Sequence, residues 1–462
     1  MTISSTSTTA PKLSVMTKLA YGIGDVGPAI VAAVSGFFLN AFLLDVAGLR
    51  PALAGAIFLI VKIWDSVNDP FIGAISDRTN TRWGRRRPWL LFGAVPFGLA
   101  FFLHWLVPDL SMAGKFWYYL VIALLLDTAY TAVNVPYTAL TPELTSDYDE
   151  RTSLNSYRFS FSILGGVLAA FFHGTIVAGF DDVLVGNALS AGIWAFFIIS
   201  TSLVTFAFTR EKHFRQEADS GPGFLEGMRI VFSNRPFIDV TAIYLLSWLC
   251  IQFVQANLLL YVRYWVGAEA QFPLLILALQ FTAFAFLLIW TRVSAKIGKK
   301  RVYYIGMSFW VLVALALFFV QPGQVALLFT LAILAGIGVS VAYLIPWSML
   351  PDVIEYDELK TGQRREGIYY GFFVFLQKLG ISLGLAFSNF ALEAAGYVNP
   401  EGVGAPFAEQ PASVLLVLRL FVSIVPAVVL LFSFYVVYRY PITREKHAEM
   451  RAELARRAQA GD

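Results

Sequence analysis

Twelve apolar runs, each close to the length that a helix needs to cross a lipid bilayer, divide this 462-residue chain. A hydrocarbon core of about 30 Å takes about 20 consecutive apolar residues in a helix. Composition agrees, because 58% of the residues are hydrophobic and only 14% are charged, whereas soluble proteins average about 25% charged residues. The sequence therefore predicts an all-α membrane protein with spans at residues 19–44, 52–74, 88–107, 114–139, 155–180, 186–208, 237–266, 270–292, 301–320, 324–350, 367–396 and 413–439.

The charges of the short loops predict the orientation in the membrane. Segment 75–87 carries five Arg, and segment 291–301 carries two Arg and three Lys, whereas the loops that alternate with the basic ones are nearly bare. Because Lys and Arg collect on the cytoplasmic side, this alternation places both termini in the cytoplasm. The first 18 residues are polar without the pattern of a cleaved signal peptide, so we expect a multi-pass protein of the plasma (inner) membrane.

A polar stretch separates six predicted spans from six. We expect an N-terminal six-helix bundle at 1–208, a cytoplasmic linker at 209–236, a C-terminal six-helix bundle at 237–440 and a cytoplasmic tail at 441–462. In each half a basic, Gly-containing loop follows the second span, which indicates two pseudo-symmetric bundles. Secondary transporters commonly have this plan, with a substrate cavity between the halves near mid-membrane.

The second span holds two carboxylates where a membrane helix otherwise carries hydrocarbon. Asp65 and Asp69 lie four residues apart, on one helical face, with Asn68 between them. A charge at mid-membrane costs roughly 2.5–3.5 kcal/mol on insertion scales, so water, a fixed cation, a proton or a metal ion must compensate it. Carboxylate and amide oxygens are hard ligands, which suit Na⁺ or H₃O⁺ rather than a soft metal. The pattern predicts a cation site, and the alternative is a helix-packing cluster neutralised by Lys62 or an Arg.

Other charged groups also fall inside predicted spans. Lys378 lies in the middle of a long run, where a buried cation needs an anionic partner such as Asp65 or Asp69, unless its side chain snorkels to an interface. Arg158, near a helix start, is either a cavity residue or a charge of the cytoplasmic gate, and Asp25 is a further cavity candidate. Polar and aromatic groups that could line a cavity or stack on a sugar ring are Thr131, Asn134, Tyr21, Tyr130, Tyr343 and Trp347.

Several function classes lack their motifs in this sequence. There is no GxxxxGK[ST] stretch of an ATP-driven pump, and no HExxH or GxSxG stretch of a membrane protease or lipase. The four His show no metal-binding spacing, the single cysteine, Cys250, excludes an internal disulfide, and nothing indicates nucleic-acid binding. We therefore expect a protein that is not an enzyme, needs no cofactor, and draws its energy from an ion gradient or from the gradient of its substrate.

Three stretches resemble the glycoside–pentoside–hexuronide:cation symporters, a branch of the major facilitator superfamily typified by the melibiose carrier. They are "KIWDSVNDPFIGAISDRTNTRWGRRRPW", "YTAVNVPYTALTPELTSDYDERTSLNSYR" and "PWSMLPDVIEYDELKTGQRREGIYYGFFVFLQKLGISLG". The similarity extends over nearly the whole chain. It implies the major facilitator fold, with twelve helices in two pseudo-symmetric six-helix bundles.

The resemblance also implies roles for individual residues. The cation site of the family falls on Asp65, Asn68, Asp69 and Thr131. Its coupling lysine and its cavity positions fall on Lys378, Arg158, Tyr130 and Tyr343. The galactoside-contacting groups of the melibiose carrier are missing, because Ala29, Asn134 and Thr138 stand at those positions. The same family includes sodium-coupled lysophospholipid carriers, which also lack those groups, and "FFLNAFLLDVAG" and "LIPWSMLPDVI" resemble them closely.

These features lead us to expect a secondary active transporter that couples Na⁺ or H⁺ to the symport of a sugar or glycoside by alternating access. The ion would bind between Asp65 and Asp69, neutralise the pair, release Lys378 and raise the affinity for substrate. One alternative is a sodium-coupled lysophospholipid symporter of the same family. An alternative from another class is a non-transporting membrane sensor.

We expect the basic loop 78–87 to close a cytoplasmic gate against acidic side chains. The residues predicted for this gate are Arg85, Arg86, Glu143, Asp352 and Glu355. The expected partners are a small-molecule substrate, which is a sugar or glycoside or else a lysolipid, and the surrounding membrane lipids. We expect no nucleic-acid partner and function as a monomer.

Overall fold

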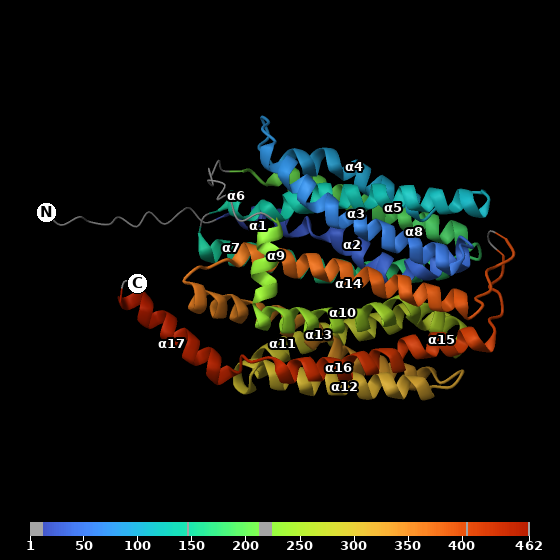
Figure 1. The fold of residues 1–462 in the computed structure, drawn as a ribbon. Coiled ribbons are helices and arrows are strands. Elements are labelled where there is room, and N and C mark those ends of the chain that lie inside the picture. The colour runs from blue at the N-terminus through green and yellow to red at the C-terminus, as the bar shows by residue number, and fades with distance from the viewer. Residues whose placement is uncertain (1–12, 146, 212–223, 403–404, 461–462) are drawn as a thin grey trace. The chain divides into compact units, whose positions relative to one another are not determined.

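The computed structural model describes residues 13–145, 147–211, 224–402 and 405–460, and these residues are mostly helical (Figure 1). The α-helices are α1 (Val15–Ile23), α2 (Val26–Val34), α3 (Pro51–Arg78), α4 (Arg87–His104), α5 (Met112–Ala139), α6 (Thr141–Leu144), α7 (Tyr148–Ala178), α8 (Val183–Phe208), α9 (Phe224–Ser233), α10 (Arg235–Tyr261), α11 (Phe272–Ile297), α12 (Lys299–Phe319), α13 (Val325–Thr361), α14 (Glu366–Ala394), α15 (Ala412–Val422), α16 (Ile424–Arg439) and α17 (Arg444–Ala460). Short π-helical or 3₁₀ turns are η1 (Ser35–Leu39), η2 (Phe42–Val46), η3 (Val262–Val266) and η4 (Glu269–Gln271). Within the described residues, 12 helical segments are long and apolar enough to cross a membrane, so the predicted number of spans is confirmed.

Polar side chains cap the N-termini of several of these helices. Ser14, Ser111, Asp147 and Asp182 each accept a hydrogen bond from a backbone N–H of the following first turn. Such a side chain satisfies a donor that the helix itself leaves unpaired, and its loss typically costs about 1 kcal/mol. The caps therefore fix where α1, α5, α7 and α8 begin.

Proline interrupts the first and the last membrane span. The ring of a proline inside a helix clashes with the carbonyl four residues before it, which belongs to Gly24 for Pro28 and to Val422 for Pro426. The chain breaks at these places: α1 gives way to α2 around Gly24, and Ser423 between α15 and α16 has φ −125° and ψ −81°. The first break places Asp25 at a helix junction inside the span.

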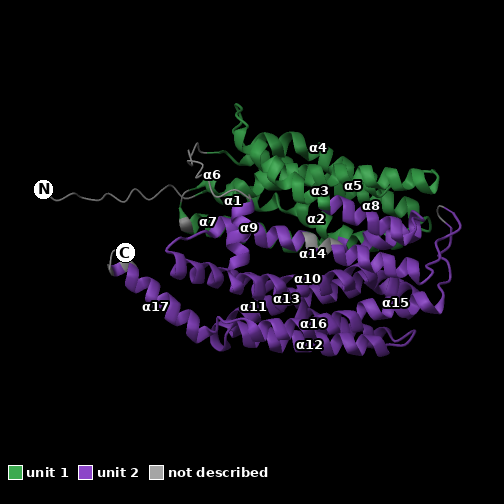
Figure 2. Ribbon diagram, in the orientation of Figure 1, with its two compact units in different colours: residues 1–35, 63–218 green, residues 36–62, 219–462 purple. Residues whose placement is uncertain are grey.

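The helices form two compact units, which Figure 2 colours separately. Unit 1 comprises residues 1–35 and 63–218, and unit 2 comprises residues 36–62 and 219–462. The division after residue 218 falls inside the predicted linker, whereas residues 36–62, which we assigned to the N-terminal bundle, group with the C-terminal half. Hydrogen bonds explain this grouping in part, because Asn40 donates to the Ala256 carbonyl at 3.2 Å and Asn399 donates to the Leu44 and Leu49 carbonyls at 3.0 and 2.8 Å.

The core of unit 2 combines aromatic side chains with small residues. Tyr244 on α10 stacks on Phe373 of α14 with ring centroids 4.2 Å apart. Where α12 and α13 pack together, a Cβ added to Gly338 would lie 2.9 Å from the Gly306 carbonyl and 2.5 Å from the Trp310 side chain. Membrane helices approach closely at such small residues, because lipid provides no hydrophobic drive to hold them together.

Among the described helices, α9 and α17 lie outside the twelve spans, as does the short α6. α9 falls in the predicted linker, which we described only as polar, and its Val231 is fully buried while Leu225 is exposed. One apolar face therefore makes part of this linker a helix that packs on unit 2. α17 forms most of the predicted tail, and Arg457 fastens it to α13 by donating to the Leu359 carbonyl at 2.9 Å.

Candidate functional site

The predicted cation site is formed where α3 faces α5 in unit 1. Trp64 Nε1 donates to Thr128 Oγ1 at 2.9 Å, and Thr131 Oγ1 donates to Asp69 Oδ1 at 2.9 Å. These two contacts join α3 to α5, on which Thr128 and Thr131 lie three positions apart and share a helical face. The structure thus brings Thr131 to the acidic pair, as the resemblance implied.

The polar groups of this site are buried. Asp65 is 2% exposed, Asn68 is 3% exposed and Thr131 is fully buried, whereas Asp69 is half-buried. The Nδ2 atom of Asn68 is buried and has no hydrogen-bond partner among the described residues. A half turn of the amide would exchange Nδ2 for Oδ1, so this side chain can offer a carbonyl oxygen to an ion without breaking a hydrogen bond of Nδ2.

The donor set of the site suits a small hard cation. Two carboxylates, one amide and one hydroxyl supply only oxygen, which Na⁺ or a hydronium ion accepts and a soft transition metal does not prefer. No group of three or more His, Cys, Asp or Glu that could hold a metal ion occurs in the described part of the chain.

The break between α1 and α2 creates a second polar cluster in unit 1. Arg158 Nε on α7 lies 3.2 Å from Asp25 Oδ1, and the Arg158 guanidinium lies 5.5 Å from the ring of Tyr137. Tyr21, which we considered as a sugar-stacking residue, is fully buried, stacks on Tyr137 and shares a hydrogen bond of 2.5 Å with Thr141. Asp25 and Arg158 are thus brought together as an ion pair, and Tyr21 serves packing.

Tyr130 and Asn134, both predicted for the cavity, lie one turn apart on α5. Asn134 Nδ2 lies 3.4 Å from the Tyr130 hydroxyl, and the Tyr130 ring meets Phe97 edge-on at 5.8 Å. The Oδ1 atom of Asn134 is buried and has no hydrogen-bond partner among the described residues. This amide can accept a hydrogen bond from a ligand.

The remaining predicted cavity residues belong to unit 2. Lys378 lies on α14 and is half-buried, and its pairing with Asp65 or Asp69 stays a prediction. Tyr343 on α13 packs against Trp248 with ring centroids 5.5 Å apart. It lines a crevice of about 50 Å³ whose other lining side chains are almost all apolar, with Gln255 and Gln280 as the polar ones. Sequence reasoning missed Trp248, Gln255 and Gln280, because single polar residues in apolar runs are common.

The gate residues of unit 1 form a compact set of ion pairs. Arg85 Nη2 lies 2.5 Å from Glu143 Oε1, and Arg86 pairs with Asp77. The hydrogen bond to Glu143 raises the pKa of the Arg85 guanidinium. Sequence reasoning missed Glu211, whose carboxylate accepts the backbone N–H groups of residues 85, 86 and 87 at 2.6, 2.8 and 2.9 Å. Glu211 therefore caps the start of α4.

The gate residues of unit 2 form a corresponding set. Lys299 Nζ, from the basic loop after the eighth span, lies 2.7 Å from both carboxylate oxygens of Asp352. Glu355 Oε2 lies 2.8 Å from His447 Nε2. Each unit thus joins the basic loop after its second span to a carboxylate near the end of its fourth span, Arg85 to Glu143 and Lys299 to Asp352. This repetition is the structural counterpart of the repeated basic loops in the sequence.

A buried polar network in unit 2 was not predicted at all. Asp45 is 2% exposed, pairs with Arg263, and accepts hydrogen bonds from the hydroxyl groups of Tyr264, at 2.7 Å, and Tyr397. Arg263 also pairs with Glu269. The network fastens the loop between the first two spans to two other loop regions of unit 2, residues 262–269 and the segment that contains Tyr397. The one available signal was an aspartate in "FLLDVAG", at the end of an apolar run.

Comparison with known proteins identifies a family, several relatives and solved structures that are similar to this chain. A family model described as "MFS/sugar transport protein" matches residues 20–444. An uncharacterised symporter, sll1374, of Synechocystis sp. is 41% identical, over 98% of this chain and 99% of that protein. The sodium-dependent lysophosphatidylcholine symporter 1 of Mus musculus is 31% identical, over 96% of this chain and 88% of that protein. The crystal structure of the nucleoside transporter NupG has the same fold, with a TM-score of 0.65, 13% identity, and coverage of 93% of this chain and 100% of that one.

Proposed function

Because this chain belongs to the MFS/sugar transport protein family, whose members are transporters rather than enzymes, we propose that it is a symporter driven by a cation gradient. The predicted resemblance to a symporter family of the major facilitator superfamily is confirmed, and the chain is an integral, multi-pass membrane protein. A non-transporting sensor has no support from these relatives. We place the basic loops on the cytoplasmic side of the plasma (inner) membrane, in line with the distribution of Lys and Arg.

The observation that carries the proposal is the oxygen-only site on α3 and α5. Asp65 and Asp69 project from one helical face, and Thr131 donates to Asp69. Two carboxylates in a membrane span repel each other unless a positive charge joins them. We propose that Na⁺ fills this role, since several relatives are named sodium-dependent symporters. One Na⁺ that moves inward down 100 mV supplies about 2.3 kcal/mol, which suffices for a modest accumulation of substrate.

Binding of the cation changes the electrostatics of the site. With the ion bound, the pair carries one negative charge less, so the predicted attraction of Lys378 to the pair would weaken. We propose that this release raises the affinity for substrate, with a coupling free energy of about 1–3 kcal/mol, as is typical for linked binding sites. Alternating access then carries ion and substrate together.

Reconstituted protein tests the cation site. Substrate uptake into liposomes is measured with an inward Na⁺ gradient, with K⁺ in place of Na⁺, and with a pH gradient alone, so that Na⁺ and H⁺ coupling are separated. Asp65→Asn and Asp69→Asn should each abolish accumulation against a gradient, while the matched control Asp239→Asn, a buried acid on α10, should keep it. The assignment is wrong if both site variants still concentrate substrate.

For the substrate we propose an amphiphile of the lysophospholipid class. Two observations support it: relatives named as lysophosphatidylcholine symporters, and the missing galactoside groups at Ala29, Asn134 and Thr138.

A sugar or glycoside remains the second candidate, since the family model is described as MFS/sugar transport protein. Asn134, with a buried carbonyl oxygen free to accept a hydrogen bond, suits a hydroxyl-bearing ligand. Uptake of labelled lysophosphatidylcholine is therefore compared with uptake of simple glycosides in the same liposomes. Ion-driven lysophosphatidylcholine uptake that glycosides do not inhibit supports the amphiphile, and the reverse result supports the sugar.

A further inference from the structure

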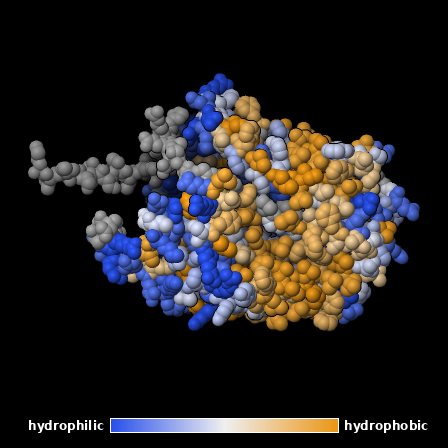
Figure 3. Space-filling model, viewed as in Figure 1, coloured by the Kyte–Doolittle hydropathy of each residue, from blue (hydrophilic) through white to orange (hydrophobic). Residues whose placement is uncertain are grey.

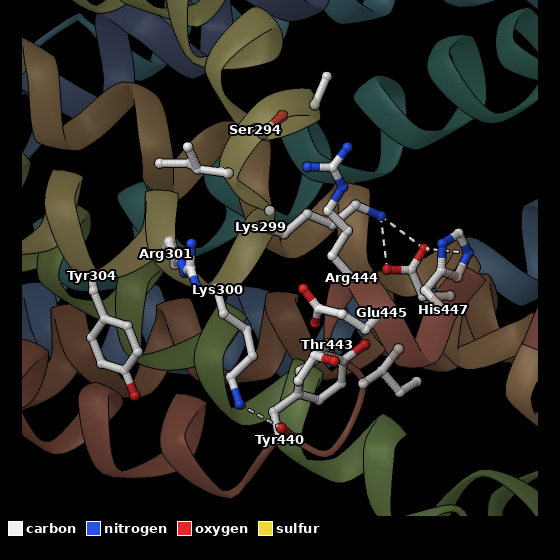
Figure 4. Close-up of a pocket in the computed structure, with 15 residues that line it drawn as sticks. Ser294, Lys299, Lys300, Arg301, Tyr304, Tyr440, Thr443, Arg444, Glu445 and His447 are labelled. Carbon is white, nitrogen blue, oxygen red and sulfur yellow. Dashed lines mark hydrogen bonds and ion pairs between the residues drawn. The ribbon is translucent and has the colours of Figure 1, made fainter. Parts of the chain in front are cut away.

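A basic pocket opens at the end of unit 2 that carries loop 291–301 (Figure 4). It has a volume of about 440 Å³ and lies where α11 and α16 end and α12 and α17 begin. Gly298 makes the sharp turn between α11 and α12 with a φ of 87°, in the left-handed region that favours glycine. The turn brings three consecutive basic residues, Lys299, Lys300 and Arg301, to the pocket.

The charges in this pocket do not cancel. Lys299 is neutralised by Asp352, whose two oxygens both lie 2.7 Å from its Nζ atom. Lys300 Nζ donates to the backbone carbonyl of Tyr440 at 2.7 Å, and Arg444 donates to the backbone carbonyl of residue 296. Lys300 also interacts electrostatically with Asp239, and Arg444 with Glu445. Figure 4 shows the side chains of Lys300 and Arg444 reaching the pocket from two different helix starts.

One acidic side chain balances part of this charge. Glu445 is exposed, and nearby Arg301 and Arg444 contribute to the lowering of the pKa of its carboxyl, after its own backbone N–H and Thr443. Within the pocket, Lys300, Arg301 and Arg444 thus face one carboxylate, while Asp239, outside the pocket lining, offsets part of the charge of Lys300. The starts of two long helices add the positive ends of their dipoles. The pocket therefore has room and positive charge for one further anion.

An apolar stripe on the lipid-facing side leads away from the pocket. Arg301, Ile305, Phe309 and Leu312 follow one another at helical spacing on α12, and the three apolar ones are 41%, 44% and 65% exposed. On α16, which packs against α12, Tyr435 and Phe432 are exposed as well. Figure 3 shows the same transition in unit 2, from hydrophilic residues near α17 to apolar residues along the spans.

We propose that this pocket binds the phosphate group of an anionic phospholipid, with the headgroup among Lys300, Arg301 and Arg444 and the acyl chains along the stripe on α12. A basic pocket at the cytoplasmic ends of membrane helices attracts acidic headgroups, and each Lys or Arg near the membrane surface adds to this attraction. Free phosphate has the same anionic chemistry but gains nothing from the apolar stripe, which favours the lipid. The site is separate from the proposed cation site, and its occupancy is measured without transport.

Lipid retention by the full-length protein tests the proposal. Purified protein is placed in nanodiscs of phosphatidylcholine with increasing fractions of phosphatidylglycerol, and bound lipid is counted by native mass spectrometry after transfer to detergent. The variant Lys300→Gln/Arg301→Gln/Arg444→Gln should retain one phosphatidylglycerol fewer and bind it at least about tenfold more weakly. The control Lys360→Gln/Arg451→Gln/Arg456→Gln removes the same charge from exposed positions outside the pocket and should behave as the unaltered protein.

A second variant and a competition experiment distinguish loss of the site from misfolding and a lipid from free phosphate. Arg301→Gln/Arg444→Gln changes exposed side chains only, so it should fold normally and still show reduced lipid retention. Inorganic phosphate and glycerol phosphate at millimolar concentration should fail to displace the lipid. Equal lipid retention by the pocket and control variants would overturn the site, and full displacement by inorganic phosphate would overturn its assignment to a lipid.

Discussion

A single hydroxyl, that of Thr131, holds one carboxylate of the proposed cation site. Thr131→Val keeps the shape of the side chain but removes its 2.9 Å hydrogen bond to Asp69. A hydrogen bond to a charged group contributes about 1.5–3 kcal/mol, so we expect the Na⁺ concentration for half-maximal uptake to rise at least about tenfold. Uptake measured over a Na⁺ series, at saturating substrate, gives this value.

Thr128 provides the matched control for that prediction. It lies on the same helix one turn earlier, and its hydroxyl accepts the hydrogen bond from Trp64 Nε1. Thr128→Val therefore disturbs the same helix contact without touching a carboxylate, and it should leave the Na⁺ dependence unchanged. Equal shifts in both variants would mean that Thr131 acts only through helix packing.

Some buried charged residues can be recognised from the sequence alone, and others cannot. Asp65 and Asp69 stand out in the sequence, because a charge inside an apolar run is costly, and their role as cation ligands stays a prediction. Asp45 does not stand out, since it ends an apolar run like many loop acids, and its partner Arg263 lies 218 residues away. Side chains paired over such distances become visible only once the fold brings their helices together.

At the scale of helices, Glu211, which follows the end of α8, binds the start of α4. Its carboxylate accepts three backbone N–H groups at the start of α4, and a Cβ on Gly84 would lie only 2.4 Å from that carboxylate. Glu211→Ala leaves these donors without their acceptor, which we expect to cost about 2 kcal/mol and to lower the Tm by several degrees. Thermal unfolding in detergent measures the loss, and Glu449→Ala, an exposed acid on α17, should not alter the Tm.

Two arginines that form ion pairs in loops of unit 2, Arg263 and Arg50, should differ strongly in their contribution to stability. Arg263 is buried between Asp45 and Glu269, whereas the Arg50 side chain, which pairs with Glu393, is 63% exposed. Removing one partner of a buried pair leaves an uncompensated charge, so Arg263→Gln should cost about 3–5 kcal/mol. Arg50→Gln should cost less than about 1 kcal/mol, because water screens that pair. Denaturant titration of both variants compares them, and equal losses would contradict this reasoning.

The number and order of the spans follow from length and hydropathy alone, but their internal breaks do not. The run at 413–439 indicates one helix, yet the chain divides at Ser423 into α15 and α16. Pro426 was visible in the sequence, but Pro70 and Pro136 lie inside unbroken helices, so a proline by itself does not locate a break. Packing against neighbouring helices decides which prolines interrupt a span.

At the scale of the whole molecule, both units contain an ion pair between a basic loop and a carboxylate. Unit 1 joins loop 78–87 to its fourth span through Arg85 and Glu143, and unit 2 joins loop 291–301 to its fourth span through Lys299 and Asp352. The sequence predicted the two basic loops but paired the first of them with Asp352 and Glu355 as well as with Glu143. Within unit 2, Asp352 and Glu355 have Lys299 and His447 as partners. The pairing of acids with bases depends on the packing of each unit, which charge patterns alone do not encode.

Double-mutant cycles on transport measure the coupling free energy between these charged residues. Arg85→Gln with Glu143→Gln, and Lys299→Gln with Asp352→Asn, should each give a coupling free energy of about 1 kcal/mol in kcat/KM, because the partners are in direct contact. A cross cycle of Arg85→Gln with Asp352→Asn tests the predicted latch between the first basic loop and Asp352. We expect its coupling to be smaller, since each side chain already engages a partner in its own unit. A cross coupling that exceeds both internal ones would show instead that the loop of one unit closes the gate on the carboxylate of the other.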